Sequence, residues 1–157
     1  MQKITPFLWF NNEAEEAVNF YTSILKDSKI HHVARYSEAG AKAAHQKEGA
    51  VMTVAFQLEG QNYTAINGGP VFKFTEAISF VVNCNNQEEI DYYWEKLSEG
   101  GDPKAQQCGW LKDKFGLSWQ IVPKAIGELM SDPSKANKVM KALLQMKKPI
   151  IADLEKA

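Results

Sequence analysis

The apolar and polar positions of this chain repeat one pattern twice, about half a chain apart. An apolar segment, Pro6–Phe10, leads through Asn11 and Asn12 into a segment with an acidic start and an aromatic pair. Ser79–Cys84 leads through a second pair of asparagines into a segment of the same kind. A repeat on this scale indicates two copies of one supersecondary unit that pack together. We therefore expect any functional site to lie between the two copies.

The first copy is predicted to contain four strands and one long helix. Asn12 is the expected N-cap of the helix, and Glu15 stands three residues later, as in a capping box. Apolar, β-branched and aromatic residues predict strands at 4–10, 29–36, 50–58 and 63–67, the last two joined by a turn. Residues 37–49 are predicted to form a loop, within which Ala41–His45 could form a short helical turn.

The Gly68-Gly69-Pro70 sequence is the strongest break in the chain and begins a predicted linker over residues 68–76. A strand at 77–84 follows, then a helix at 87–98 with Asn86 as N-cap and Glu89 three residues later. A short strand near 104–107 and a hairpin of 108–112 and 117–123 come next, and the remaining segments, 124–130, 133–146 and 150–155, read as helices. The predicted fold class is α+β, with one βαβββ module at about 3–67, a second at about 77–123, and a helical tail at 124–157.

Length and composition fit one compact domain, or two half-domains that share a core. Of the 157 residues 45% are hydrophobic, and 18 basic residues against 19 acidic ones give a net charge of −1. This balance gives no reason to expect nucleic acid or an anionic membrane as a partner. No stretch approaches the roughly 18 apolar residues of a spanning helix, and no signal-peptide core is visible. The two cysteines are too few for a disulfide framework, so we expect a cytoplasmic protein.

Several motifs resemble one protein family. The most specific is Asp113–Pro123, which reads DKFGLSWQIVP. It is joined by shorter runs at 4–10, 14–17, 20–21, 67–70, 77–80 and 108–111. In these motifs the chain is similar to the PhnB-like branch of the vicinal oxygen chelate superfamily, whose members are often labelled 3-demethylubiquinone-9 3-methyltransferase domain proteins. The resemblance implies one glyoxalase-like domain over 1–157, in which two βαβββ modules form a curved, cup-like mixed sheet that is often completed in a homodimer.

The same resemblance raises the question of a metal. The superfamily includes glyoxalase I, fosfomycin-resistance proteins and extradiol dioxygenases, and its catalytic members hold a divalent metal through His or Glu on the first and last strands of each module. Carried over by spacing, these positions fall near Pro6, at 64–67, at Ala77 or Ser79, and at Gln120. None of them is His, Asp or Glu, so we expect no metal and no other cofactor. The glycine-rich turn that holds S-adenosylmethionine in doubly wound sheets is not visible either.

The three histidines do not restore a metal site in the sequence. His31 and His32 are adjacent on a predicted strand and should face opposite sides of the sheet, and His45 lies in the predicted loop. One of His31 and His32 could still point into the cup as a lone acid or base. Cys108 could act as a reactive thiol, although the reading of Cys84 and Cys108 as inert, buried residues is favoured.

The predicted cup has apolar walls and a few neutral polar groups. These groups are the candidate ligand-binding residues, namely Thr5, Asn67, Ser79, Ser118 and Gln120. They suit recognition of a small organic molecule but supply no acid, base or nucleophile, so no catalytic residue is assigned. The leading hypothesis is a metal-independent small-molecule-binding protein. The alternatives are an enzyme acting on a small quinone-like or electrophilic substrate, and a structural protein whose helical tail mediates assembly.

Overall fold

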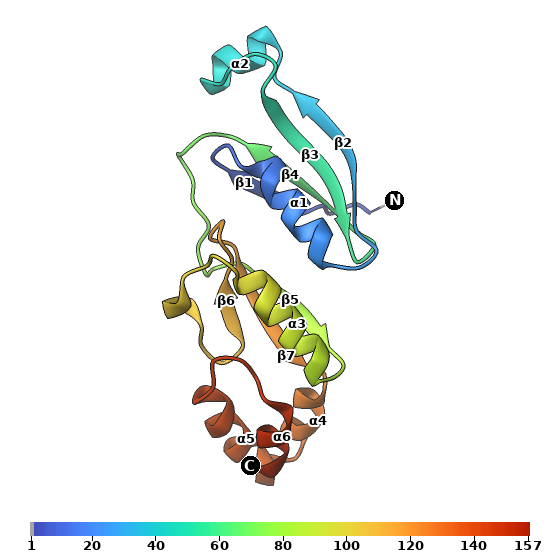
Figure 1. Cartoon of the computed structure of the whole chain (residues 1–157), viewed down its shortest axis with the longest axis vertical. Coiled ribbons are helices and arrows are strands. Elements are labelled where there is room, and N and C mark those ends of the chain that lie inside the picture. Colours follow the sequence, from blue (N-terminus) through green and yellow to red (C-terminus); the bar gives the residue numbers. More distant parts are fainter. Residues whose placement is uncertain (1) are drawn as a thin grey trace. The chain divides into compact units, whose positions relative to one another are not determined.

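A computed structural model describes residues 2–157 of the chain, and Figure 1 shows the order of its elements. The chain forms two compact units, divided between Lys73 and Phe74. Each unit contains one mixed sheet with a long helix packed against it, which confirms the predicted α+β class with two modules. The treatment of both modules as a single domain stays a prediction. No helix in the described part of the chain combines the length and apolar character needed to cross a bilayer.

The first unit consists of a four-stranded sheet with α1 packed on one face. Its elements are β1 (Phe7–Phe10), α1 (Ala14–Ile24), β2 (Lys29–Arg35), α2 (Glu38–Ala44), β3 (Val51–Leu58) and β4 (Gln61–Asn67). The strand order is β1-β4-β3-β2, with β1 parallel to β4 and the other pairs antiparallel. Alternate strand residues such as Leu8, Val54 and Ala65 are buried on the α1 face, because successive side chains point to opposite sides. We call the other side of this sheet its open face.

The structure corrects three local predictions in the first unit. Asn12 is not the N-cap of α1; Glu13 occupies that position, and its side chain accepts a bond from the Asn12 N–H instead of capping the helix. Residues 38–44 of the predicted loop form a helix because the Ser37 hydroxyl accepts from Gly40 N. β1 begins at Phe7 and not at residue 4, since the Pro6 carbonyl is the first backbone group to bond to β4.

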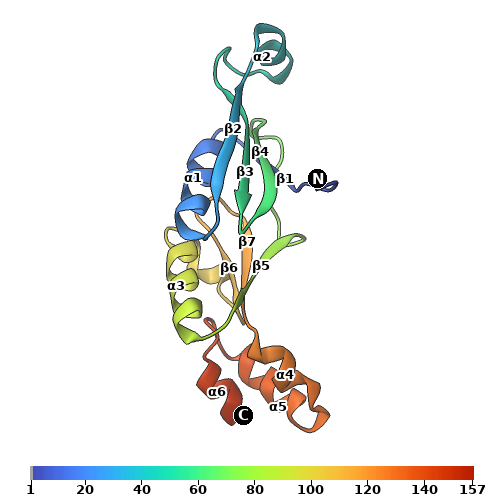
Figure 2. The same cartoon turned by 90° about the vertical axis from the view of Figure 1, so that its right-hand side faces the viewer.

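The second unit contains a three-stranded sheet, α3 and the helical tail. Its elements are β5 (Ser79–Cys84), α3 (Gln87–Ser98), the 3₁₀ turn η1 (Pro103–Ala105), β6 (Trp110–Lys112), β7 (Ser118–Pro123), α4 (Ala125–Ser131), α5 (Pro133–Leu144) and α6 (Ile151–Lys156). The strand order is β5-β7-β6, with β5 parallel to β7. α3 packs against the sheet, and Figure 2 shows it along one side of the strands. The opposite side is the open face of this sheet.

One predicted strand of the second unit is absent from its sheet. Residues 103–105 form the 3₁₀ turn because Asp102 accepts a bond from Lys104 N and Pro103 fixes the first turn. Only Gln107 makes an isolated bridge, to Trp110. Between residues 74 and 123 the second module therefore has three strands where βαβββ was predicted. The capping of α3 is as predicted, since Asn86 Oδ1 accepts from Glu89 N at 2.9 Å.

The tail is attached to its own unit by backbone and side-chain hydrogen bonds. The N–H groups of Cys108 and Gly109 donate to the carbonyls of Met146 and Lys147. The Gln87 side chain at the start of α3 donates to Pro149 O and accepts from Ile151 N. The tail thus continues the second unit and holds the turn that leads into β6.

Candidate functional site

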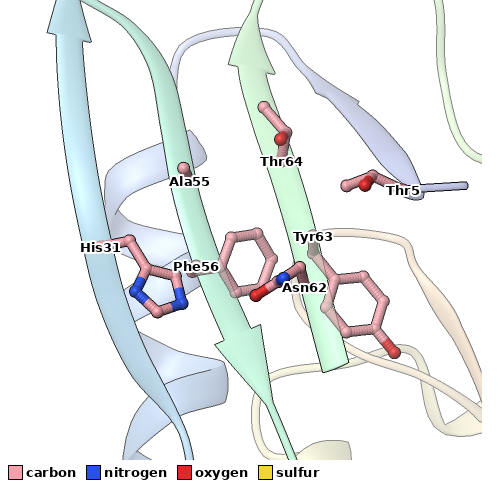
Figure 3. A pocket seen from close by; sticks show the side chains of 7 residues that line it. All are labelled: Thr5, His31, Ala55, Phe56, Asn62, Tyr63 and Thr64. Carbon is pink, nitrogen blue, oxygen red and sulfur yellow. The ribbon is translucent and has the colours of Figure 1, made fainter. Parts of the chain in front are cut away.

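The first unit contains an open, solvent-facing cavity of about 420 Å³. We call it the first-module cavity, and its lining residues are Thr5, His31, Ala55, Phe56, Asn62, Tyr63 and Thr64. Figure 3 shows that they come from β2, β3, β4 and the segment before β1. Hydroxyl, amide and imidazole groups lie around the apolar Ala55 and Phe56. This combination suits a small organic ligand that forms a few hydrogen bonds.

The N-terminal segment brings Thr5 to this cavity. Gln2 acts as a substitute for strand pairing, because its amide oxygen accepts from Asn62 N and its amide nitrogen donates to Asn62 O. The Thr64 N–H then donates to Pro6 O at 3.0 Å. Figure 3 shows Thr5 beside Thr64 as a result. The predicted ligand-binding residue Thr5 therefore lies in the cavity.

His31 reaches the cavity through a β-bulge. Ile30 pairs with Phe56 and His32 pairs with Ala55, so His31 is an extra residue between two consecutive partners. A bulge breaks the alternation of side chains, and bulges commonly re-aim a residue next to a site. Strict alternation, on which the sequence-based argument for His31 and His32 rested, is interrupted at this position. Figure 3 shows the His31 imidazole extending from β2 toward β3.

Tyr63 provides a neutral hydroxyl at the edge of the cavity. Its ring stacks on Phe56 with a centroid distance of 5.5 Å, and its hydroxyl donates to Gln61 Oε1. Burial raises the pKa of Tyr63, because ionisation would place a charge in a partly apolar environment. The group therefore serves as a hydrogen-bonding phenol and not as a phenolate.

Asn67, another predicted ligand-binding residue, uses its side-chain amide in hydrogen bonds within the protein. It is 6% exposed, its Oδ1 accepts from Ala14 N, and its Nδ2 donates to Val51 O. Its backbone carbonyl accepts from the Tyr36 hydroxyl. These bonds tie α1 and β3 to the end of β4.

Ser79, Ser118 and Gln120 come together on the open face of the second-unit sheet. Ser118 pairs with Ser79 of β5 on one side and with Lys112 of β6 on the other. The side chains of Ser79, Ser118 and Lys112 therefore project from the same face in a row, and Gln120 lies two residues beyond Ser118 on that face. Gln120 Nε2 donates to Ser79 Oγ at 2.8 Å. We call these four residues the second-module polar row. Lys112 also forms an ion pair with Glu76, which lowers the pKa of that exposed carboxylate mainly through their hydrogen bond.

Comparison with known proteins gives the family of the chain. Residues 2–122 match the family described as 3-demethylubiquinone-9 3-methyltransferase. The chain belongs to this family. A putative 3-demethylubiquinone-9 3-methyltransferase, PhnB protein, from Bacillus cereus is 42% identical, with 78% of this chain and 99% of that chain covered and a TM-score of 0.66. No curated protein matches the chain.

Two more distant structures share the fold alone. A Pseudomonas aeruginosa protein has 18% identity and a TM-score of 0.59, with 78% of this chain and 98% of that chain covered. The fosfomycin resistance protein FosX from Mesorhizobium loti has 10% identity and a TM-score of 0.56, with 84% of this chain and 100% of that chain covered. The family match ends at residue 122, so helices α4 to α6 lie outside it.

The family relationship makes the superfamily metal the implied group, and the residues here do not fit it. The positions carried over from the metal-binding members hold Pro6 and Thr64 to Asn67 in the first module and Ala77 or Ser79, with Gln120, in the second. Hydroxyl and amide groups do not supply the charge that offsets desolvation of a divalent ion. In the second module the Ser79–Gln120 hydrogen bond joins two of these positions directly.

Neither cysteine is placed in the first-module cavity. Cys84 is buried at the end of β5, where burial and the nearby Glu89 carboxylate raise the pKa of its thiol to about 11. It is therefore protonated at neutral pH and a poor nucleophile. Cys108 lies in the turn before β6, with a φ of 41° and its N–H bonded to the tail.

Sequence reasoning missed several residues of the two sites. Asn62 and Tyr63 were assigned only to a turn and a strand, and Lys112 only to a hairpin. The alternation of residues along a strand could have placed Lys112 on the face of Ser118, given the hairpin register. The bulge at His31 leaves no signal in residue types, because it depends on how β2 pairs with β3.

Proposed function

We propose that the protein binds a small, neutral organic molecule in the first-module cavity without the superfamily metal. The observation that carries this proposal is the cavity itself, in which uncharged hydrogen-bonding side chains lie around Ala55 and Phe56. Its volume of about 420 Å³ falls within the range of small-molecule sites, roughly 300–1,000 Å³. The family relationship and the neutral residues at the carried-over metal positions support the same reading.

The lining residues favour a ligand with both donors and acceptors. Thr5, Tyr63 and Thr64 carry hydroxyls that donate or accept, and Asn62 carries both an acceptor oxygen and a donor amide. None of these four groups supplies a charge for an ionic partner. A compound with carbonyl or hydroxyl groups on a small ring, such as a quinone or phenol, meets these conditions.

A binding screen with matched variants tests the proposal. The full chain would be screened by ligand-observed NMR against neutral quinones, phenols and hydroxyketones, and native mass spectrometry of protein from its source would identify any retained ligand. Thr64→Val and Tyr63→Phe should each weaken binding by about five- to tenfold, since each removes one hydrogen bond. Ser23→Ala, on the exposed surface of α1, is the control. Hits that bind all variants equally would contradict the assignment of the cavity.

The second candidate function is an enzyme acting on a small quinone-like or electrophilic substrate. The bulge that brings the His31 imidazole to the cavity favours it, because imidazole is the side chain best suited to proton transfer near neutral pH. His31→Gln should then abolish turnover of a cavity ligand, while His32→Gln and Cys108→Ala should leave it unchanged. Equal activity of His31→Gln and the natural protein would remove this candidate.

The proposal includes a homodimer in the cytoplasm and does not include nucleic acid or membrane partners. Large apolar side chains stand exposed on both units, such as Phe7 at 59% and Val81 at 49%, and a second copy of the chain would cover such residues. Sedimentation equilibrium would measure the mass, and a monomer at all concentrations would contradict the dimer. Cell fractionation would check the compartment.

A further inference from the structure

The second-module polar row contains a buried hydroxyl without a hydrogen-bond partner. Ser118 is 1% exposed, and its Oγ has no hydrogen bond within residues 2–157. Burying an unpaired hydroxyl is unfavourable, and such groups are uncommon in native proteins. The Ser118 hydroxyl would therefore gain its missing hydrogen bond if a ligand bound to this row.

This row offers several unused hydrogen-bond donors, beside the acceptor oxygen of Gln120. Ser118 can donate its hydroxyl proton. Ser79 accepts from Gln120, so its own hydroxyl proton is available, and Gln120 uses one of its two amide protons in that bond. Lys112, opposite Ser118 in the register, adds an ammonium group. Several donors and one cation on neighbouring positions favour an anion with oxygen acceptors.

A carboxylate from the protein already binds at the end of this row. Glu76, in the segment before β5, approaches Lys112 with Nζ–Oε1 at 2.5 Å. Glu76 is 64% exposed, and an exposed ion pair of this kind contributes little to stability. A competing anion can therefore replace Glu76 at low cost.

We propose that the second-module polar row binds the carboxylate or phosphate group of a small molecule, which displaces Glu76 from Lys112 and accepts a hydrogen bond from Ser118. Glu76 then acts as an internal competitor that holds Lys112 in place until the ligand arrives. This site lies wholly within the second unit, and it does not depend on ligand binding in the first-module cavity.

Titration of the full chain with two probes tests the site. Sodium phosphate and sodium benzoate, each against sodium chloride at equal ionic strength, would be added to ¹⁵N-labelled protein. We expect saturable shifts at the backbone amides of residues 79, 112 and 118 with at least one probe. A response to benzoate alone assigns a carboxylate, a response to phosphate alone assigns a phosphate group, and either supports the proposal. No saturable shift at these amides with either probe, in the natural protein and in Glu76→Gln, would overturn it.

Three variants separate this mechanism from simple surface attraction. Glu76→Gln removes the competitor and should tighten anion binding by about fivefold or more, while Lys112→Gln and Ser118→Ala should each weaken it about tenfold or more. Glu95→Gln and Lys147→Gln are charge-matched controls at exposed positions, and should change little. Equal or weaker binding by Glu76→Gln would contradict the competitor role.

The stability of Ser118→Ala gives a second, independent readout. An unpartnered buried hydroxyl contributes nothing favourable, so its removal should leave the urea midpoint of the anion-free protein unchanged or higher. A lower midpoint for Ser118→Ala would show that the hydroxyl already has a partner in the protein, and it would overturn the proposal.

Discussion

The helices α1 and α3 follow the two copies of the repeated strand pattern, yet they begin with different hydrogen bonds. α1 has Glu13 at its N-cap without a capping side-chain bond, and its first residue, Ala14, donates to Asn67 Oδ1 from the end of β4. α3 is capped locally, because Asn86 accepts from Glu89 N and the Glu89 carboxylate accepts from Asn85 N.

The partner strand explains this difference. The last residue of β1, Phe10, pairs with Asn67, whereas the last residue of β5, Cys84, pairs with Pro123. Asn67 offers a side-chain acceptor to the helix that follows, and Pro123 offers none. The repeat in the sequence therefore determines the order of strand, turn and helix. The neighbouring strand determines which side chain accepts a hydrogen bond from the start of the helix.

The largest effect should come from the hairpin turns, which also differ between the modules. The β6–β7 turn is organised around buried Asp113, whose Oδ1 accepts from Phe115 N and Leu117 N and whose Oδ2 accepts from Trp119 Nε1. Asp113→Ala leaves three donors without these bonds and should lower the free energy of unfolding by about 4 kcal/mol. Urea unfolding of the full chain, localised to each unit by hydrogen exchange, would measure this loss.

The β3–β4 turn supplies the matched control for Asp113. It consists of Glu59 and Gly60, both with positive φ, and it depends on backbone geometry instead of a buried carboxylate. Glu59→Ala removes only the bond to Lys26 N and should cost less than about 1 kcal/mol. Equal losses for Asp113→Ala and Glu59→Ala would contradict the difference drawn between the two turns.

The second largest effect should come from Asn67, which tests the comparison of the helix starts directly. Asn67→Ala leaves Ala14 N and Val51 O without their side-chain partners in a buried position, so we expect a loss of about 2–3 kcal/mol. Asn86→Ala removes an ordinary N-cap and should cost about 1 kcal/mol. Hydrogen exchange should show faster exchange in α1 for the first variant and in α3 for the second. Similar stability losses would show that the long-range cap is no stronger than the local one.

These contacts show what the sequence could and could not reveal. Strand and helix positions followed from periodicity, because burial on one face imposes a period of two or 3.6 residues. The turn motif around Asp113 carried the family resemblance, but the structural role of Asp113 depends on the Trp119 side chain reaching back across the hairpin. Of the candidate site residues, Thr5 lies in the first-module cavity and Ser118 in the second-module polar row. The Asn67 side chain instead accepts a hydrogen bond from the start of α1. Such roles depend on strand register, which local patterns do not encode.

A third, smaller effect should distinguish two attachments of the tail to the second unit. Gln87 makes two hydrogen bonds to the tail, at Pro149 O and Ile151 N, whereas Lys148 makes an exposed ion pair with Asp91. Gln87→Ala should cost about 1–2 kcal/mol. Lys148→Ala should cost about 0.5 kcal/mol or less, because solvent screens the pair. Urea unfolding would measure the free energy of unfolding of both variants. A larger loss of stability for Lys148→Ala would mean that the ion pair, and not the Gln87 hydrogen bonds, holds the tail to the unit.

The smallest effect is the pH dependence of stability, which differs between the two modules at one corresponding position, the last residue of the first strand. The end of β1 holds Phe10, which does not titrate, while the end of β5 holds Cys84, whose thiol pKa is raised from 9.0 to about 11 by burial and by Glu89. The folded state therefore retains this proton more strongly than the unfolded chain. Its contribution to stability is complete below about pH 9 and is lost as the pH rises toward 11.

Comparison with Cys84→Val isolates this contribution from the titration of other groups. The difference in unfolding free energy between the natural protein and Cys84→Val should change by about 1 kcal/mol between pH 8 and pH 10, with the natural protein losing more. The thiol also donates to Val82 O at 3.7 Å, a hydrogen bond that exists only while the thiol is protonated. Loss of this bond and ionisation of the unfolded chain therefore both lower stability as the pH rises. A pH-independent difference would mean that the Cys84 thiol ionises as readily in the folded protein as in the unfolded chain. In that case the end of β5 would be open to water, and the buried position described for Cys84 would be wrong.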